Sequence, residues 1–175
     1  MKAAALPTVF IIDDDRGMRQ AIQDLVESVG LRAESFATGQ EFLSRRPTAD
    51  TSCLVLVVRL PHMSGIELQR RRIAVGIQTP VIFITAHGDV PLSVRALKSG
   101  AIEFLTKPFR DQDLLDAIQQ ALQRDRAMRE QQAEVRELHG RYQALTARGR
   151  EVLGFVVSGL VNKQIGSEIG ASEAL

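Results

Sequence analysis

Val9-Phe10-Ile11-Ile12-Asp13-Asp14-Asp15 is an apolar run that ends abruptly in three carboxylates, and it indicates the class of fold. A continuous apolar run of this length is typical of a strand buried on both faces of a parallel sheet. Similar runs recur at residues 53–58, 81–85 and 101–105. Residues 32–36 alternate apolar and polar side chains, as an edge strand does. The chain therefore contains five candidate strands.

Helical patterns separate the five strands, which predicts right-handed crossovers and an α/β fold with helices on both faces of one parallel sheet. The expected helix starts lie near Arg16, Gly39, Ser64, Pro91 and Asp111. Of these residues, Ser64 and Asp111 are expected to be N-caps. Gly30 and Gly100 stand where the first and fourth helices should end.

Composition restricts the class of protein. With 175 residues, 45% of them hydrophobic and 25% charged, the chain can form one well-buried domain and an appendage. A net charge of +1 argues against electrostatic attraction of the whole chain to nucleic acid or membrane. One cysteine, Cys53, cannot form an internal disulfide. The longest apolar run is far shorter than the roughly 20 residues that span a bilayer, and residues 1–7 lack a signal-peptide core, so we expect a cytoplasmic protein.

Polar side chains stand at the carboxyl ends of three apolar runs. Asp13 and Asp14 follow the first run, Thr85 ends another, and Lys107 comes shortly after the last. Because the carboxyl ends of parallel strands border one crevice, these side chains can converge on a phosphoryl group and its Mg²⁺. The run at 53–58 ends without a carboxylate.

Five motifs between Pro7 and about Arg124 together resemble the receiver domain of two-component response regulators, in particular the FixJ/LuxR type. The motifs are Ile11-Ile12-Asp13-Asp14-Asp15, Arg59-Leu60-Pro61-His62-Met63-Ser64-Gly65, Phe83-Ile84-Thr85-Ala86-His87-Gly88-Asp89, Lys98-Ser99-Gly100-Ala101 and Phe104-Leu105-Thr106-Lys107-Pro108-Phe109. The resemblance implies a flavodoxin-like (βα)5 receiver over residues 1–124, with sheet order 2-1-3-4-5.

The resemblance also implies a role for each pocket residue. Asp13 and Asp14 would bind Mg²⁺, Thr85 would follow the incoming phosphoryl group, and Lys107 would be its counter-charge. Phe104 would change rotamer with Thr85 as the switch, and the peptide bond before Pro108 would be cis.

Val57 stands where the family has its phosphorylated aspartate. Valine has no atom that can attack a phosphoryl donor or bind Mg²⁺, and no Asp or Glu lies between Ser52 and Ile66. We therefore expect a pseudo-receiver with no catalytic residue and with Mg²⁺ binding weakened or absent. Lys107 is expected to pair with Asp13 and Asp14 instead of a phosphate.

The helical pattern continues beyond the receiver as a linker over residues 125–144. Apolar side chains recur in it at three- and four-residue spacing, with Gln131 at an interior position, as in a coiled coil. These side chains are Met128, Val135, Leu138, Tyr142 and Leu145. Two interpretations stay open: a solvated helix against its own receiver, or a helix that pairs with a second copy.

Residues 145–175 resemble the opening of a LuxR-type helix-turn-helix domain, with Thr146 and Asn162 as N-caps. The match stops at residues 171–173, before the recognition helix that the family would place in the major groove. Specific DNA binding by this chain is therefore expected to be impaired.

The preferred function is a response-regulator-like protein of two-component phosphorelay signalling that controls transcription and is not an enzyme. The resemblance implies a cognate histidine kinase as one partner. It also implies that the chain pairs with itself or with a full-length paralogue through the face at residues 90–122 and the linker. No membrane partner is expected. A haloacid-dehalogenase-like phosphatase would use Asp13, Asp15, Thr85 and Lys107, but only helix follows Lys107 where that class needs a second acidic pair. A stand-alone dimerisation or interaction module is the third alternative.

Overall fold

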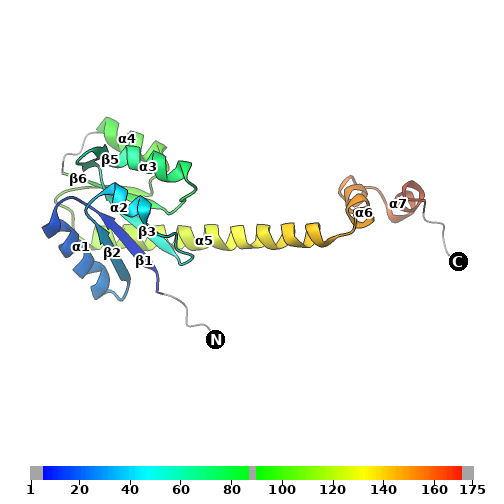
Figure 1. The fold of residues 1–175 in the computed structure, drawn as a ribbon, viewed down its shortest axis with the longest axis horizontal. Coiled ribbons are helices and arrows are strands. Elements are labelled where there is room, and N and C mark those ends of the chain that lie inside the picture. Colours follow the sequence, from blue (N-terminus) through cyan, green and yellow to red (C-terminus); the bar gives the residue numbers. More distant parts are fainter. Residues whose placement is uncertain (1–5, 87–89, 171–175) are drawn as a thin grey trace. The chain divides into compact units, whose positions relative to one another are not determined.

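The structure is a computed structural model that describes residues 6–86 and 90–170 (Figure 1). The chain divides into two compact units, Met1–Arg129 and Glu130–Leu175. The last three residues of the motif at 83–89, and residues 171–173 where the helix-turn-helix resemblance stops, lie outside the described residues.

The first unit is built on one parallel sheet, and its strand order confirms the flavodoxin-like prediction. Across the sheet the strands are β2 (Arg32–Phe36), β1 (Thr8–Ile12), β3 (Ser52–Val57), β6 (Val81–Thr85) and β7 (Glu103–Thr106). The alternating segment β2 lies at an edge, as predicted. A short antiparallel pair in the loop after β3 consists of β4 (Arg59–Leu60) and β5 (Met63–Ser64).

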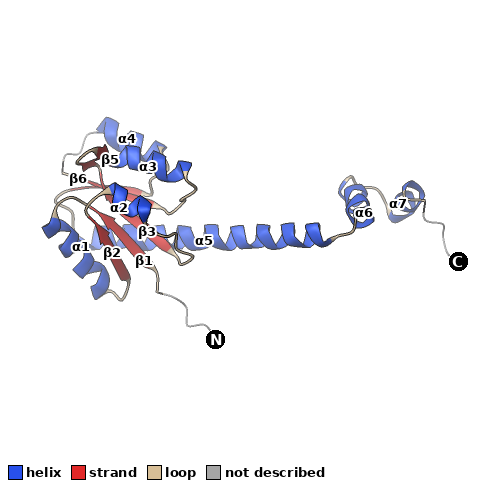
Figure 2. Ribbon diagram, viewed as in Figure 1, coloured by secondary structure: helices blue, strands red, loops and turns tan. Residues whose placement is uncertain are grey.

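Helices cover both faces of this sheet (Figure 2). On one face, α1 (Arg16–Ser28) and α5 (Asp111–Ala144) pack Val26, Leu114 and other apolar side chains against the strands. On the other face lie α2 (Gly39–Ser44), α3 (Gly65–Ala74) and α4 (Val90–Lys98). Because β1, β3 and β6 are buried on both sides, their sequences are apolar except for one terminal residue each, Thr8, Ser52 and Thr85.

The helix ends follow the sequence in most places. Ser64 is the N-cap of α3, and its hydroxyl accepts a hydrogen bond from the amide of Glu67 at 3.1 Å. Gly30 and Gly100 have φ of 80° and 91° directly beyond α1 and α4, a conformation that glycine adopts without a Cβ penalty. The prediction of Asp111 as an N-cap is wrong. Asp111 is the first helical residue, because the carbonyl of Arg110 accepts the first intrahelical hydrogen bonds.

The first unit extends past the predicted end of the receiver at residue 124. Asp125 is buried, and its carboxylate accepts hydrogen bonds from the backbone N–H of Ser52 at 2.8 Å and from Nε of Arg129 at 2.5 Å. Arg129 in turn donates to the carbonyl of Ala49 at 2.9 Å. The amino end of β3 therefore holds one more turn of α5 than the apolar pattern indicates.

The second unit contains the rest of α5, α6 (Ala147–Val157) and α7 (Asn162–Glu168). Thr146 caps α6 through the amide of Gly149 at 3.0 Å, as predicted. The prediction of Asn162 as a cap is wrong, because the carbonyl of Val161 accepts the first helical hydrogen bond of α7. No helix within the described ranges has the length and apolar character needed to cross a membrane.

Candidate functional site

The parallel register brings the predicted pocket residues to one edge of the sheet. Asp13 directly follows β1, Val57 ends β3, Thr85 ends β6 and Lys107 directly follows β7. Asp13, Thr85 and Val57 are buried, with 3%, 3% and 8% of their surface exposed, whereas Asp14 is exposed. The carboxyl ends of four neighbouring strands, the expected phosphoryl pocket, thus carry one carboxylate, one hydroxyl, one amine and one isopropyl group.

Asp13 is the electrostatic centre of this pocket. Its Oδ2 forms an ion pair with Nζ of Lys107 at 3.1 Å, and its Oδ1 accepts a hydrogen bond from the amide of Asp15 at 2.9 Å. The expected pairing of Lys107 with Asp13 is therefore confirmed, whereas the expected pairing with Asp14 is wrong, because no ion pair among the described residues joins Lys107 to Asp14. The side chain of Asp14 is exposed, and Arg19 donates hydrogen bonds to the carbonyls of Asp13 and Asp14 at 2.7 and 3.0 Å.

Asp15 has a separate, local role. Its side chain caps α1 by accepting a hydrogen bond from the amide of Met18 at 2.9 Å. That hydrogen bond holds the pKa of Asp15 below its usual value, with smaller contributions from Lys107 and Arg19. The three consecutive carboxylates thus divide between the pocket, the solvent and a helix cap.

The backbone around Val57 is closely packed. The loop that follows β3 packs tightly there: a Cβ on Gly65 would lie 2.4 Å from the carbonyl oxygen of Val57, and the Gly65 amide donates to the carbonyl of Val58 at 2.7 Å. Glycine at 65 is therefore required by the close approach of two backbone segments. The position at which the family resemblance expects an aspartate is therefore closely packed and 8% exposed.

The described residues offer poor ligands for the Mg²⁺ ion that the fold family implies. Within the described ranges, no group of three or more His, Cys, Asp or Glu side chains is placed to hold a metal ion. Both oxygens of Asp13 already have partners, and Val57 has no side-chain oxygen. Mg²⁺ prefers several oxygen ligands in octahedral geometry, so Asp13 and Asp14 alone are a weak site.

Thr85 is the last residue of β6, and Phe104 lies in β7, the neighbouring strand. The carbonyl of Thr85 accepts a hydrogen bond from the amide of Lys107 at 2.7 Å, which sets the position of the lysine. Phe104 lies opposite Phe83 in the β6–β7 ladder, and it is partly buried against the core between the sheet and helices α2 to α4. The Lys107–Pro108 peptide bond is cis.

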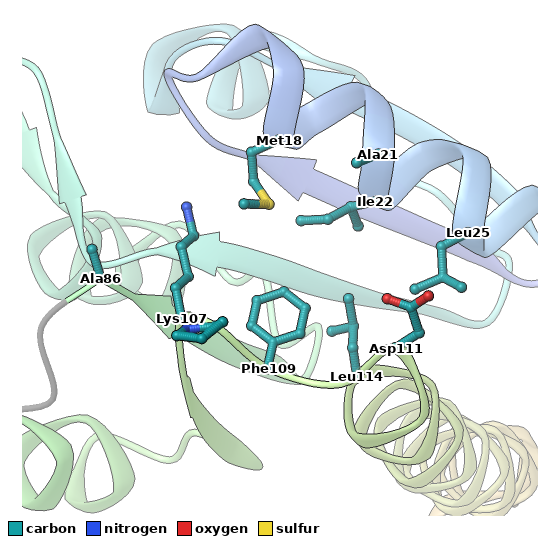
Figure 3. Close-up of a pocket in the computed structure, with 10 residues that line it drawn as sticks. Met18, Ala21, Ile22, Leu25, Ala86, Lys107, Phe109, Asp111 and Leu114 are labelled. Atoms are coloured by element: carbon teal, nitrogen blue, oxygen red, sulfur yellow. The ribbon is translucent and has the colours of Figure 1, made fainter.

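An apolar cavity of about 420 Å³ adjoins the pocket on the side of α1, and sequence reasoning did not identify it (Figure 3). Lys107, which pairs with Asp13, lines this cavity, and Met18, Ile22 and Phe109 form part of its apolar wall. The three- and four-residue spacing of Met18, Ala21, Ile22 and Leu25 was the available signal. That spacing also fits a helix that packs on a sheet, so it indicates burial without distinguishing a cavity.

Comparison with known proteins places these features in a family. Residues 9–119 match the family described as the response regulator receiver domain. Nodulation protein W of Bradyrhizobium diazoefficiens is 45% identical over 172 residues, which cover 98% of this chain and 76% of that protein. Response regulator protein TmoT of Ectopseudomonas mendocina is 43% identical, covering 95% and 76%. The solved structure of response regulator StyR has a TM-score of 0.86 and 46% identity, covering 97% of this chain and 85% of that one.

Proposed function

Because this chain belongs to the response regulator receiver family, we propose that it is a regulator of transcription whose receiver takes no phosphoryl group at position 57. Relatives named as regulators of transcription, such as TdiR of Thauera aromatica at 36% identity over 98% of this chain, support the regulatory class. The proposed loss of phosphorylation rests on the side chain at position 57.

Val57 is the observation that carries this proposal. Phosphorylation of a receiver requires a carboxylate oxygen that attacks the phosphorus of the donor, and an isopropyl group has no lone pair. Asp13 cannot easily replace it, because its two oxygens are engaged by Lys107 and by the amide of Asp15. Lys107 is likewise engaged with a protein carboxylate and not free to serve an incoming anion.

The same geometry supports weakened Mg²⁺ binding. An aspartate at 57 would contribute a third carboxylate beside Asp13 and Asp14. Without it, the counter-ion of the buried Asp13 is the amine of Lys107, supplied by the protein. An ion pair inside the pocket thus takes over the charge balance that a metal ion would otherwise supply.

An enzymatic function has little support from this geometry. A phosphatase reading would use Asp15 as the second catalytic carboxylate, but Asp15 is exposed and caps α1. The relatives reported above are named as regulators, which supports a non-enzyme at the level of the family.

We also propose that α6 and α7 do not form a DNA-binding domain by themselves. Val156, Val157 and Val161 are 51%, 81% and 62% exposed, so these helices leave apolar surface uncovered. A DNA-binding domain needs a packed core to hold its recognition element in place. Binding of specific DNA by a polypeptide of these 175 residues is therefore expected to be weak.

Restoring the carboxylate tests the central proposal. The native chain, Val57→Asp and the isosteric control Val57→Asn are incubated with acetyl phosphate and Mg²⁺, and intact mass is measured before and after hydroxylamine. We expect a hydroxylamine-labile gain of one phosphoryl group in Val57→Asp alone. An equal gain in the native chain would show that another residue accepts the group and would overturn the proposal.

A further inference from the structure

The linker part of α5 exposes an apolar seam. Between residues 130 and 145, the apolar side chains larger than alanine are Val135, Leu138, Tyr142 and Leu145. Val135, Leu138 and Tyr142 are 59%, 62% and 43% exposed, and their spacing of three and four residues puts them on one side of α5. Leu145, which is 37% exposed, lies directly beyond the end of the helix. A row of exposed apolar side chains on an otherwise polar helix indicates a surface that a partner covers.

We propose that this seam pairs with the same seam of a second copy of the chain, and that the two helices run antiparallel. In heptad terms Val135 and Tyr142 are a positions, and Gln131 and Leu138 are d positions. The inference rests on the proposed function, because a regulator without phosphoryl transfer needs an association surface that phosphorylation does not create.

Side-chain size favours the antiparallel arrangement. With the two-fold axis between residues 136 and 137, Val135 faces Leu138 of the second copy and Gln131 faces Tyr142 of the second copy. The bulky ring then lies against a smaller side chain, and the phenol hydroxyl has an amide as hydrogen-bond partner. In a parallel pair, two tyrosines would meet in one layer and two glutamines in another.

Charge favours the same arrangement. The residues that flank the seam at g positions are Glu134 and Arg141, and g positions face g positions in an antiparallel pair. Each Glu134 then faces Arg141 of the second copy, which forms two interchain ion pairs. A parallel pair would instead place Glu134 opposite His139 and Arg141 opposite Thr146. Within its own chain Arg141 contacts Glu137 at 2.6 Å, an exposed pair that an interchain partner can share.

Charge reversal tests the pairing in the full chain. Sedimentation equilibrium over a range of concentrations measures the dimer dissociation constant of Glu134→Arg, Arg141→Glu and the double variant. Each single variant replaces the two interchain ion pairs between positions 134 and 141 by like-charge repulsion, so we expect its dissociation constant to be about fivefold higher than that of the native chain. The double variant restores opposite charges, and its dissociation constant should lie within about twofold of the native value. Glu130→Arg makes the same charge change away from the seam and should leave the constant unchanged.

Cysteine crosslinking tests the orientation. A mixture of Gln131→Cys and Tyr142→Cys should form a disulfide-linked dimer. Gln131→Cys alone should not, because in the antiparallel pair the two copies of position 131 are eleven residues of helix apart, about 16 Å. The native Cys53 is buried and will not interfere. A monomer at all concentrations, additive charge reversals, or self-crosslinking of Gln131→Cys would overturn the proposal. None of these outcomes affects the phosphoryl assay, which tests Val57 separately.

Discussion

Replacing Asp125 by alanine should destabilise the first unit by about 1–4 kcal/mol. Asp125 is 3% exposed, and its Oδ2 accepts hydrogen bonds from the amide of Ser52 at 2.8 Å and from Arg129 at 2.5 Å. Removing the carboxylate leaves the fully buried Ser52 amide without its acceptor, which costs about 1–3 kcal/mol. The side chain of Arg129 is 31% exposed, so loss of its ion pair adds at most about 1 kcal/mol.

Asp125→Asn separates the two contributions. Asparagine keeps an oxygen that can accept the Ser52 hydrogen bond, and it removes the charge. We therefore expect a loss of about 1 kcal/mol, smaller than that of the alanine variant. Urea unfolding followed by far-ultraviolet circular dichroism measures both losses, and hydrogen exchange of the Ser52 amide reports the local effect.

Asp113→Ala is the matched control, because Asp113 pairs with Arg110 on the exposed side of the same helix. Its unfolding midpoint should stay at the native value. If Asp125→Ala and Asp113→Ala shift the midpoint equally, or if the Ser52 amide exchanges at the native rate in Asp125→Ala, the argument that this buried carboxylate joins α5 to β3 is wrong.

Two further predictions concern the core of the first unit. Gly65→Ala should destabilise the unit by about 1–3 kcal/mol, because the new Cβ would lie 2.4 Å from the backbone oxygen of Val57. Gly154→Ala in α6 meets open space and should be neutral or slightly stabilising. Equal unfolding midpoints for the two variants would contradict this expectation. Burial raises the pKa of the Cys53 thiol above its usual value. A thiol-specific alkylating reagent at pH 8 should therefore label Cys53 only as fast as the first unit unfolds. Rapid labelling in the absence of denaturant would refute the burial of Cys53.

The sequence pattern was enough to predict the parallel sheet and the edge at which the site lies, whereas the order of the strands was implied by the family resemblance. Continuous apolar runs such as residues 81–85 have one stable location, the centre of a sheet covered on both faces, and parallel strands end at a common edge. The pocket residues Asp13, Thr85 and Lys107 could therefore be named from their places in the chain. Val57 could be recognised as a departure only through the resemblance, since a valine in a buried strand is ordinary.

Tertiary structure decided which of several chemically equivalent groups does what. Asp13, Asp14 and Asp15 are the same residue type in succession, and only the folded chain assigns one to Lys107, one to solvent and one to the cap of α1. The limit of the first unit was likewise hidden, because Asp125 looks like a surface residue of a polar helix. Its partner Ser52 lies 73 positions away in the chain, and a hydrogen bond between them exists only after the sheet and α5 have packed. Local patterns determine which side chains are buried, whereas the pairing of polar atoms depends on distances that only the complete fold sets.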